Sequence, residues 1–245
     1  MNLRGTILAG LVCAQVIVAG RHARVCYDAP GLTLRPSTII QPQVLPVQKE
    51  ERPEPIQSLR PGGRILLLGD SLAMGMTKRW RSLAKENGYE FSVEAKGGTR
   101  VDQWGPKVKS IVSSKKPDIM VVSLGTNDAG MSNPESQRNY VRTIVDVVTK
   151  SCVIIVWVLP PPLPESLRGR DKMIEIISNE LSNKGIIFDS NQATSGRAKD
   201  GIHYSTQGYS DWTDSIWQEL IQQKVIGYNV TSTSSNNCRQ PNHRP

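Results

Sequence analysis

Residues 64–71 read RILLLGDS, an aliphatic run that ends in glycine, aspartate and serine. The consecutive aliphatic residues at positions 65–68 are typical of a strand that is buried on both faces of a parallel sheet. Downstream, apolar residues recur at helical spacing as far as Leu83 and Ala84, and Asn87-Gly88 supplies a stop. The sequence therefore predicts a strand that passes through a short polar turn directly into a helix.

The same alternation of strand and helix continues towards the C-terminus. Further strands are predicted at residues 91–93, 119–124, 153–158 and 186–188. Helices are predicted at residues 101–112, 134–150, 173–181 and 209–223, and Gly105-Pro106 interrupts the first of these. Repeated strand–helix units build a parallel sheet with helices on both faces. We therefore expect an α/β fold, a three-layer α/β/α sandwich around a central, parallel, five-stranded sheet.

The first 20 residues have the pattern of an export signal. Arg4 precedes an apolar run, Thr6–Ala19, and Val18-Ala19-Gly20 supplies compact residues at a cleavage position. The run is shorter than the roughly 20 apolar residues that span a membrane comfortably. We therefore predict that residues 1–20 are a signal peptide or, alternatively, a retained membrane anchor, and that the protein is exported to the periplasm, the envelope or the medium. A buried element of the main domain is less favoured, because a proline-rich stretch follows.

Proline-rich and polar flanks bound the predicted domain. Residues 21–61 contain prolines at a density that blocks helix interiors and central strands, so we predict an extended linker. Residues 227–245 are rich in serine, threonine and asparagine and are predicted to form a flexible C-terminal tail. The folded α/β domain is therefore expected at residues 62–226.

The four cysteines are Cys13, Cys26, Cys152 and Cys238. Cys13 lies in the apolar N-terminal run, and Cys152 opens an apolar strand, where we expect a buried thiol that acts as a small hydrophobe. Cys26 and Cys238 lie in the flanks and could pair in an oxidising compartment. The spacing carries no C-x-x-C metal signature. We expect the protein to require neither a metal nor an organic cofactor.

The formal net charge of +8 attracts anionic partners by long-range electrostatics. The sequence has no run of lysine and arginine with interleaved aromatic residues and no nucleic-acid-binding module. We therefore expect a solvated basic surface and no nucleic-acid partner. Association with a membrane or the cell envelope is expected through the N-terminus.

Polar motifs follow the predicted strands at the points where each strand ends. They are Gly69-Asp70-Ser71, Gly97-Gly98-Thr99, Gly125-Thr126-Asn127-Asp128 and, before the last helix, Asp200-Gly201-Ile202-His203. Functional residues of parallel sheets gather at the carboxyl ends of the strands. Each motif alone is more often a turn, a loop cap or a structural histidine, but the ordered set of four favours a catalytic site.

Ser71 and His203 have the residue types of a nucleophile and its base. A serine hydroxyl is a weak nucleophile until a base removes its proton, and a neutral imidazole does this near pH 7. The other histidines, His22 and His243, lie in the flanks. A turn would bring the carboxylate of Asp200 to the second ring nitrogen of His203, where it fixes the tautomer. We therefore predict a triad of Ser71, His203 and Asp200.

Attack on an ester creates an oxyanion that needs preorganised hydrogen-bond donors. The Ser71 backbone N–H, a glycine N–H in a tight loop and the Asn127 side-chain amide are the predicted donors. Glycine suits the second position because a side chain would obstruct the substrate there.

The four motifs, in this order, resemble those of the SGNH hydrolases, also called GDSL esterases or lipases. The resemblance covers about Arg64 to Lys224 and implies the flavodoxin-like fold of that family, with Ser71, Asn127, Asp200 and His203 in its defining blocks. The glycine block matches less closely: Gly97 corresponds to the oxyanion glycine, whereas a shift of one residue would select Gly98.

The arrangement of Gly97-Gly98-Thr99 followed by Trp104 resembles carbohydrate acetylesterases within that family. Trp104 is therefore a candidate for stacking on a sugar, and a core tryptophan on an amphipathic helix is the equal alternative. Asp70 and Thr99 are further candidates for contact with the substrate, although Asp70 is also expected to support its turn, as Asp128 supports the Asn127 loop.

These features together predict an exported serine esterase that hydrolyses small acyl esters, O-acetyl groups above all, on a small molecule or an envelope or extracellular polysaccharide. One alternative keeps the triad but passes the acyl group to a glycan hydroxyl, as an O-acetyltransferase. Another is a surface protein that binds glycan without turnover. The sequence leaves the oligomeric state open.

Overall fold

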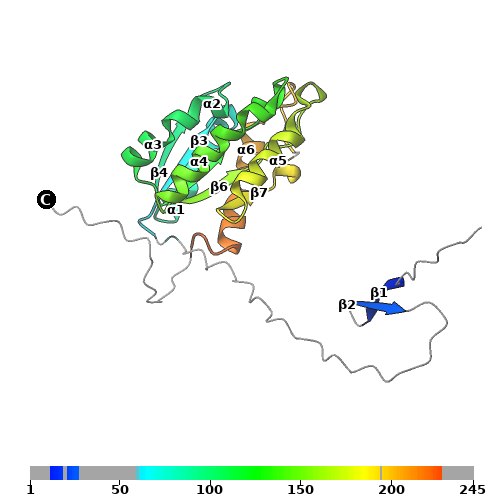
Figure 1. Ribbon diagram of the computed structural model, residues 1–245. Helices are drawn as coiled ribbons and strands as arrows, with labels where there is room; N and C mark the ends of the chain where they lie inside the picture. Colours follow the sequence, from blue (N-terminus) through cyan, green and yellow to red (C-terminus); the bar gives the residue numbers. More distant parts are fainter. Residues whose placement is uncertain (1–11, 19–20, 28–58, 60, 194, 228–245) are drawn as a thin grey trace, which may run out of the picture. The chain divides into compact units, whose positions relative to one another are not determined.

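The computed structural model describes residues 12–18, 21–27, 59, 61–193 and 195–227, and Figure 1 draws them as two compact units. The units are Met1–Glu51 and Arg52–Pro245. In the first, strands β1 (Val12–Val18) and β2 (Arg21–Tyr27) pair antiparallel, with Val12 opposite Tyr27. This two-stranded sheet lies across the predicted boundary at residue 20, between an apolar leader and an extended linker. No helix within the described ranges is long and apolar enough to cross a membrane.

The second unit is built on a parallel five-stranded sheet with the strand order β4-β3-β5-β6-β7. The strands are β3 (Arg64–Gly69), β4 (Glu90–Ala95), β5 (Ile119–Ser123), β6 (Ile154–Val158) and β7 (Ile186–Phe188). The central strands β3 and β5 are almost wholly buried, as their aliphatic runs predict. Five strands were expected, and the structure confirms all of them.

Helices cover both faces of this sheet (Figure 1), which confirms the three-layer sandwich. Alternate residues of a strand point to opposite faces, and Ile65 and Leu67 of β3 accordingly pack with helices α1 and α6, whereas Leu66 and Leu68 pack with α3, α4 and α5. The helices are α1 (Ser71–Glu86), α2 (Val101–Trp104), α3 (Val108–Lys115), α4 (Arg138–Lys150), α5 (Arg170–Leu181) and α6 (Thr206–Gln222).

Short 3₁₀ turns complete the loops. Gly105-Pro106 breaks the second helix as predicted, so that the 3₁₀ turn η1 (Gly105–Lys107) separates α2 from α3. The other 3₁₀ turns are η2 (Asp128–Gly130), η3 (Pro134–Gln137), η4 (Glu165–Leu167) and η5 (Ser190–Gln192).

The two ends of the domain are joined beside α1. The Leu59 N–H donates to the Val225 carbonyl at 2.6 Å, and Leu59 forms a parallel bridge with Ile226. The Tyr89 hydroxyl donates to the Leu59 carbonyl and accepts from the Gly227 N–H. Leu59 thus packs with the domain, although it lies within the stretch predicted as linker.

Cys152 corrects one expectation. Its side chain is exposed rather than buried, its φ of +57° is left-handed, and it is disulfide-bonded rather than a free thiol. The reason is local: α4 ends at Lys150, so Cys152 lies in the turn that reverses the chain before β6. The side chains of the other cysteines, and with them the predicted pairing of Cys26 with Cys238, lie outside the described residues.

Candidate active site

The register of the sheet brings three predicted motifs to the same level. Gly69 at the end of β3 pairs with Ala95 of β4 on one side and with Ser123 of β5 on the other. Each strand therefore enters its polar loop at the same edge of the sheet. Ser71 and Gly97 follow their strands by two residues, which places them on adjacent loops.

The turn before Ser71 is tight and leaves no room for a side chain at Gly69. A Cβ atom on Gly69 would lie 2.3 Å from the Ser123 carbonyl oxygen and 2.6 Å from the Ala73 Cβ. Asp70 is the N-cap of α1, and its Oδ1 accepts the Leu72 N–H at 2.9 Å. Ser71 is thereby the first residue of the helix, next to its positive end.

Ser71, His203 and Asp200 form a continuous hydrogen-bonded chain. The distance from His203 Nε2 to Ser71 Oγ is 2.9 Å, and that from His203 Nδ1 to Asp200 Oδ2 is 2.6 Å. The hydrogen bond from His203, followed by the backbone N–H groups of Ile202 and His203, holds the pKa of Asp200 well below its usual range. Because an ionised Asp200 only accepts, Nδ1 carries the proton and Nε2 remains an acceptor for the Ser71 hydroxyl.

The histidine loop is held in place by a residue that sequence reasoning missed. The Arg197 guanidinium donates to the Gly201 carbonyl at 2.5 Å and to the Pro162 carbonyl, and it lies 4.8 Å from the Tyr204 ring centroid. The Ala198 N–H donates to the His203 carbonyl at 2.8 Å. No short motif marks Arg197, because its partner at Pro162 is distant in sequence.

Three backbone N–H groups, that of Ser71 and two of the neighbouring glycine loop, are available to a ligand. Within the described part of the chain, the N–H groups of Ser71, Gly97 and Gly98 donate to no protein acceptor. A Cβ atom on Gly97 would lie 3.8 Å from the Ser71 Cβ, whereas nothing lies within 4 Å of the same position on Gly98. Gly97 is therefore the glycine that adjoins Ser71, and Gly98 supplies the positive φ, +71°, of the turn.

The Asn127 side chain connects the loops that follow strands β3, β4 and β5. Its Nδ2 donates to the Asp70 Oδ2 and to the Thr99 carbonyl, each at 3.0 Å. The predicted oxyanion donor thus lies in the site, but both of its amide hydrogens already have acceptors. A substrate oxygen would have to share one of them.

The buried residues Asp70, Thr99 and Trp104 correct the expected substrate contacts. Asp70 is fully buried, and Thr99 and Trp104 are 5% and 7% exposed. The Trp104 Nε1–H donates to Thr99 Oγ1 at 2.9 Å, and the Thr99 hydroxyl donates to the Lys96 carbonyl at 2.6 Å. Trp104 is therefore a core residue that braces the Gly97 loop, and it offers no face to a sugar. This is the alternative that helical apolar spacing also allowed.

Two buried carboxyl groups lie behind the triad. Burial raises the pKa of Asp70 to about 7 and that of Asp128 to about 6. Asp128 accepts the Val101 N–H at 3.2 Å and so fixes the start of α2 beside the Asn127 loop. Among the described residues, no group of three or more His, Cys, Asp or Glu side chains could hold a metal ion.

The triad is open to solvent. The His203 and Asp200 side chains are 41% and 48% exposed. Two cavities, of about 200 and 60 Å³, lie elsewhere, the first against Arg64 and Lys115 and the second between Phe188 and Trp212. Neither is lined by Ser71, Asp200 or His203.

Comparisons with known proteins agree with this fold. The model of the GDSL-like lipase/acylhydrolase family matches residues 67–210. A GDSL-like lipase from Bacteroides thetaiotaomicron VPI-5482 is similar in structure, with 18% identity and a TM-score of 0.55 over 65% of this chain and 88% of that one. A catalytic mutant of an acetylxylan esterase from Geobacillus stearothermophilus gives 16% identity and a TM-score of 0.54 over 67% of this chain and 96% of that one. No curated protein sequence matches significantly.

Proposed function

Because this chain belongs to the GDSL-like lipase/acylhydrolase family, we propose that it is a serine esterase that cleaves small acyl esters through an acyl-enzyme with Ser71. Membership confirms the resemblance of the motifs and gives the general class, a hydrolase acting on esters. The finer proposal depends on one observation, the hydrogen-bonded chain from Ser71 through His203 to Asp200.

In the first half of the reaction, Ser71 Oγ attacks the ester carbonyl carbon while His203 Nε2 accepts its proton. Asp200 stabilises the resulting imidazolium through the Nδ1–H bond. The tetrahedral intermediate collapses when the bond to the alcohol oxygen breaks, and His203 gives its proton to that oxygen. The products are a free alcohol and an ester of Ser71.

In the second half, water gives a proton to His203 Nε2 and attacks the Ser71 ester carbonyl. Collapse returns the proton to Ser71 Oγ and releases the carboxylic acid. The N–H groups of Ser71 and Gly97, which donate to no acceptor among the described residues, support a role as donors to the oxyanion at each step. Asn127 would share its amide with them.

The openness of the triad supports a short acyl group on a bulky alcohol, such as an O-acetyl group on a polysaccharide. Exposed His203 and Asp200 side chains beside Ser71 leave room for a large glycan, whereas a long acyl chain would need an enclosing groove. The acetylxylan esterase is a structural neighbour with this type of substrate. The disulfide at Cys152 supports export, because disulfides persist in oxidising compartments.

Labelling with a fluorophosphonate, together with hydrolysis of p-nitrophenyl acetate, tests the nucleophile. Ser71→Ala should abolish labelling and lower kcat/KM by about 10⁴-fold or more, and Asp200→Asn should lower it by about 10²–10⁴-fold. Ser114→Ala, which removes a surface hydroxyl on α3, is the matched control and should label normally. Labelling that persists in Ser71→Ala would sink the proposal.

The polysaccharide is tested separately with acetylated xylan. Release of acetate supports the proposed substrate, and an acetylated acceptor that forms from a donor ester would instead favour the acyltransferase. If both acetylated glycans and short-chain esters resist the folded protein, the substrate class is wrong.

A further inference from the structure

A large apolar side chain is exposed one helical turn after the nucleophile. Met74 is 52% exposed, and among the described residues only Tyr140, at 38%, is a comparably large exposed hydrophobic residue. Met74 lies three residues after Ser71 on α1, so the two side chains lie on neighbouring parts of the helix surface. An apolar side chain of this size beside a catalytic hydroxyl offers contact area to a bound substrate.

Met74 and Gly75 lie on opposite sides of Ser71. At about 100° per residue, Met74 is turned about 60° from Ser71 in one direction and Gly75 about 40° in the other. A Cβ atom on Gly75 would lie 2.2 Å from the Tyr209 ring of α6, so this side of α1 faces α6. On the other side, Met74 Sδ lies 3.8 Å from the Cβ position of Gly97.

The imidazole of His203 approaches from the α6 side. His203 directly precedes Tyr204, whose ring centroid is 5.4 Å from that of Tyr209. In the proposed reaction the alcohol oxygen receives its proton from His203 Nε2, so the alcohol leaves on that side. The carbonyl oxygen points to the N–H groups of Ser71 and Gly97, so the acyl substituent takes the remaining direction, away from His203 and past Met74.

We propose that Met74 contacts the acyl chain of the substrate and sets the preference of the enzyme for chain length. This inference rests on the proposed esterase function and adds the residue that distinguishes acetyl from longer acyl groups. The unbranched thioether of methionine adapts to chains of different length. Burial of a methylene group against it would raise kcat/KM by up to about fourfold.

The test uses p-nitrophenyl acetate, butyrate and hexanoate with Met74→Ala and with Met74→Gln, a polar side chain of similar shape. Both variants should lower the ratio of kcat/KM for butyrate over acetate by about three- to tenfold. Activity on acetate, which has no methylene group to bury, should fall less than activity on butyrate or hexanoate. Tyr140→Ala, on α4 in the opposite helix layer, is the matched control and should leave the ratio unchanged.

The outcomes separate the two proposals. Unchanged ratios in both Met74 variants, with hydrolysis that still requires Ser71, would overturn the role of Met74 and leave the esterase intact. A change in preference among acetate esters of different alcohols, with no change among acyl chains, would also overturn it. If the wild-type protein hydrolyses none of these esters and takes no fluorophosphonate label, the esterase function fails and this inference fails with it.

Discussion

Asp70 serves two neighbours of Ser71 at once. Its Oδ1 caps α1 through the Leu72 N–H, and its Oδ2 accepts from the Asn127 amide. The carboxyl group is fully buried, and burial, with the nearby charge of Asp128, raises its pKa to about 7 against the opposing effect of the Leu72 hydrogen bond. This one side chain therefore couples the start of α1 to the predicted oxyanion donor.

The raised pKa of Asp70 predicts a stability that depends on pH. The folded protein holds a proton on Asp70 between its ordinary pKa of 3.8 and its folded pKa of about 7, where the unfolded chain does not. This group's contribution to the free energy of unfolding therefore falls as the pH rises across that window. In Asp70→Asn the decrease between pH 5 and pH 8 should be smaller by up to about 3 kcal/mol, since about two pKa units of the shift lie above pH 5 and each corresponds to about 1.4 kcal/mol.

Urea denaturation at both pH values measures this difference. Asp211→Asn, at an exposed aspartate on α6 that bonds to Gln207, is the control and should keep the wild-type pH dependence. The amide introduced by Asp70→Asn would also place a hydrogen against the Asn127 amide, so kcat should fall. Equal pH dependence in wild type and Asp70→Asn would contradict the burial argument.

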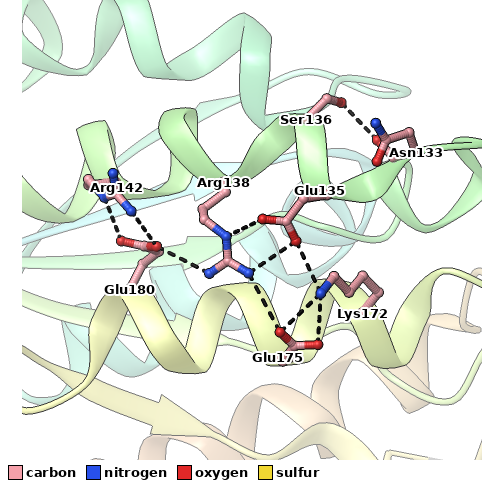
Figure 2. A network of polar contacts seen from close by, with 8 residues as sticks. All are labelled: Asn133, Glu135, Ser136, Arg138, Arg142, Lys172, Glu175 and Glu180. Atoms are coloured by element: carbon pink, nitrogen blue, oxygen red, sulfur yellow. Dashed lines mark hydrogen bonds and ion pairs between the residues drawn. The ribbon is translucent and has the colours of Figure 1, made fainter.

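At the scale of elements, an ionic network holds α5 against α4 (Figure 2). Glu180 of α5 has a side chain only 9% exposed, and it accepts from Arg142 at 2.8 and 3.0 Å and from Arg138 at 3.2 Å. The remaining members of this network are Glu135, Lys172 and Glu175. The start of α5 is also tied to the Asn127 side of the site, because the Gly169 N–H donates to the Ala129 carbonyl at 2.9 Å.

Removal of the charge of Glu180 should destabilise the protein. The hydrogen bond from Arg142, and then that from Arg138, lowers the pKa of Glu180 below its ordinary 4.5. The stability from this group is therefore present above that value and is lost as the pH falls through the folded pKa. Glu180→Gln should lower the free energy of unfolding at pH 7 by about 1–3 kcal/mol, between the values for exposed and buried ion pairs.

The matched control makes the same substitution in an exposed pair. Arg168 and Glu165 are 81% and 86% exposed, so Glu165→Gln should change the free energy of unfolding by less than about 0.5 kcal/mol. The deficit of Glu180→Gln should also shrink as the pH falls below 4.5. A deficit that stays constant down to acid pH would point to packing rather than charge.

At the scale of the whole molecule, the disulfide at Cys152 links the turn between α4 and β6 to another part of the chain. A cross-link stabilises mainly by restricting the unfolded chain, typically by about 2–4 kcal/mol. Reduction with dithiothreitol should therefore lower the Tm of the wild-type protein by more than the Tm of Cys152→Ser. Peptide mapping without reduction would identify the bonded cysteine, and a reduced Cys152 peptide in that map would contradict the bond.

Short aliphatic runs predicted the strands, and apolar residues at helical spacing predicted the helices. Both patterns are local properties of the chain. The break at Gly105-Pro106 was predicted for the same reason, since proline lacks the N–H that a helix interior needs. Cys152 was misjudged because its burial depends on where α4 stops, and the apolar residues that follow it gave no sign of the turn.

Of the candidate site, the amino-acid order alone gave Ser71, Asp200 and His203, since each follows a recognisable strand end or precedes a helix. The fold brings Ser71 and His203, 132 positions apart, to 2.9 Å. Contacts between loops also decide that Trp104 faces the core and that Met74 lies beside Gly97. They also decide that the Asn127 amide donates its hydrogen bonds to Asp70 and Thr99. These contacts depend on the register of strands that are distant in sequence. Strand pairing and packing, rather than the local sequence, determine which side chains become neighbours across a sheet.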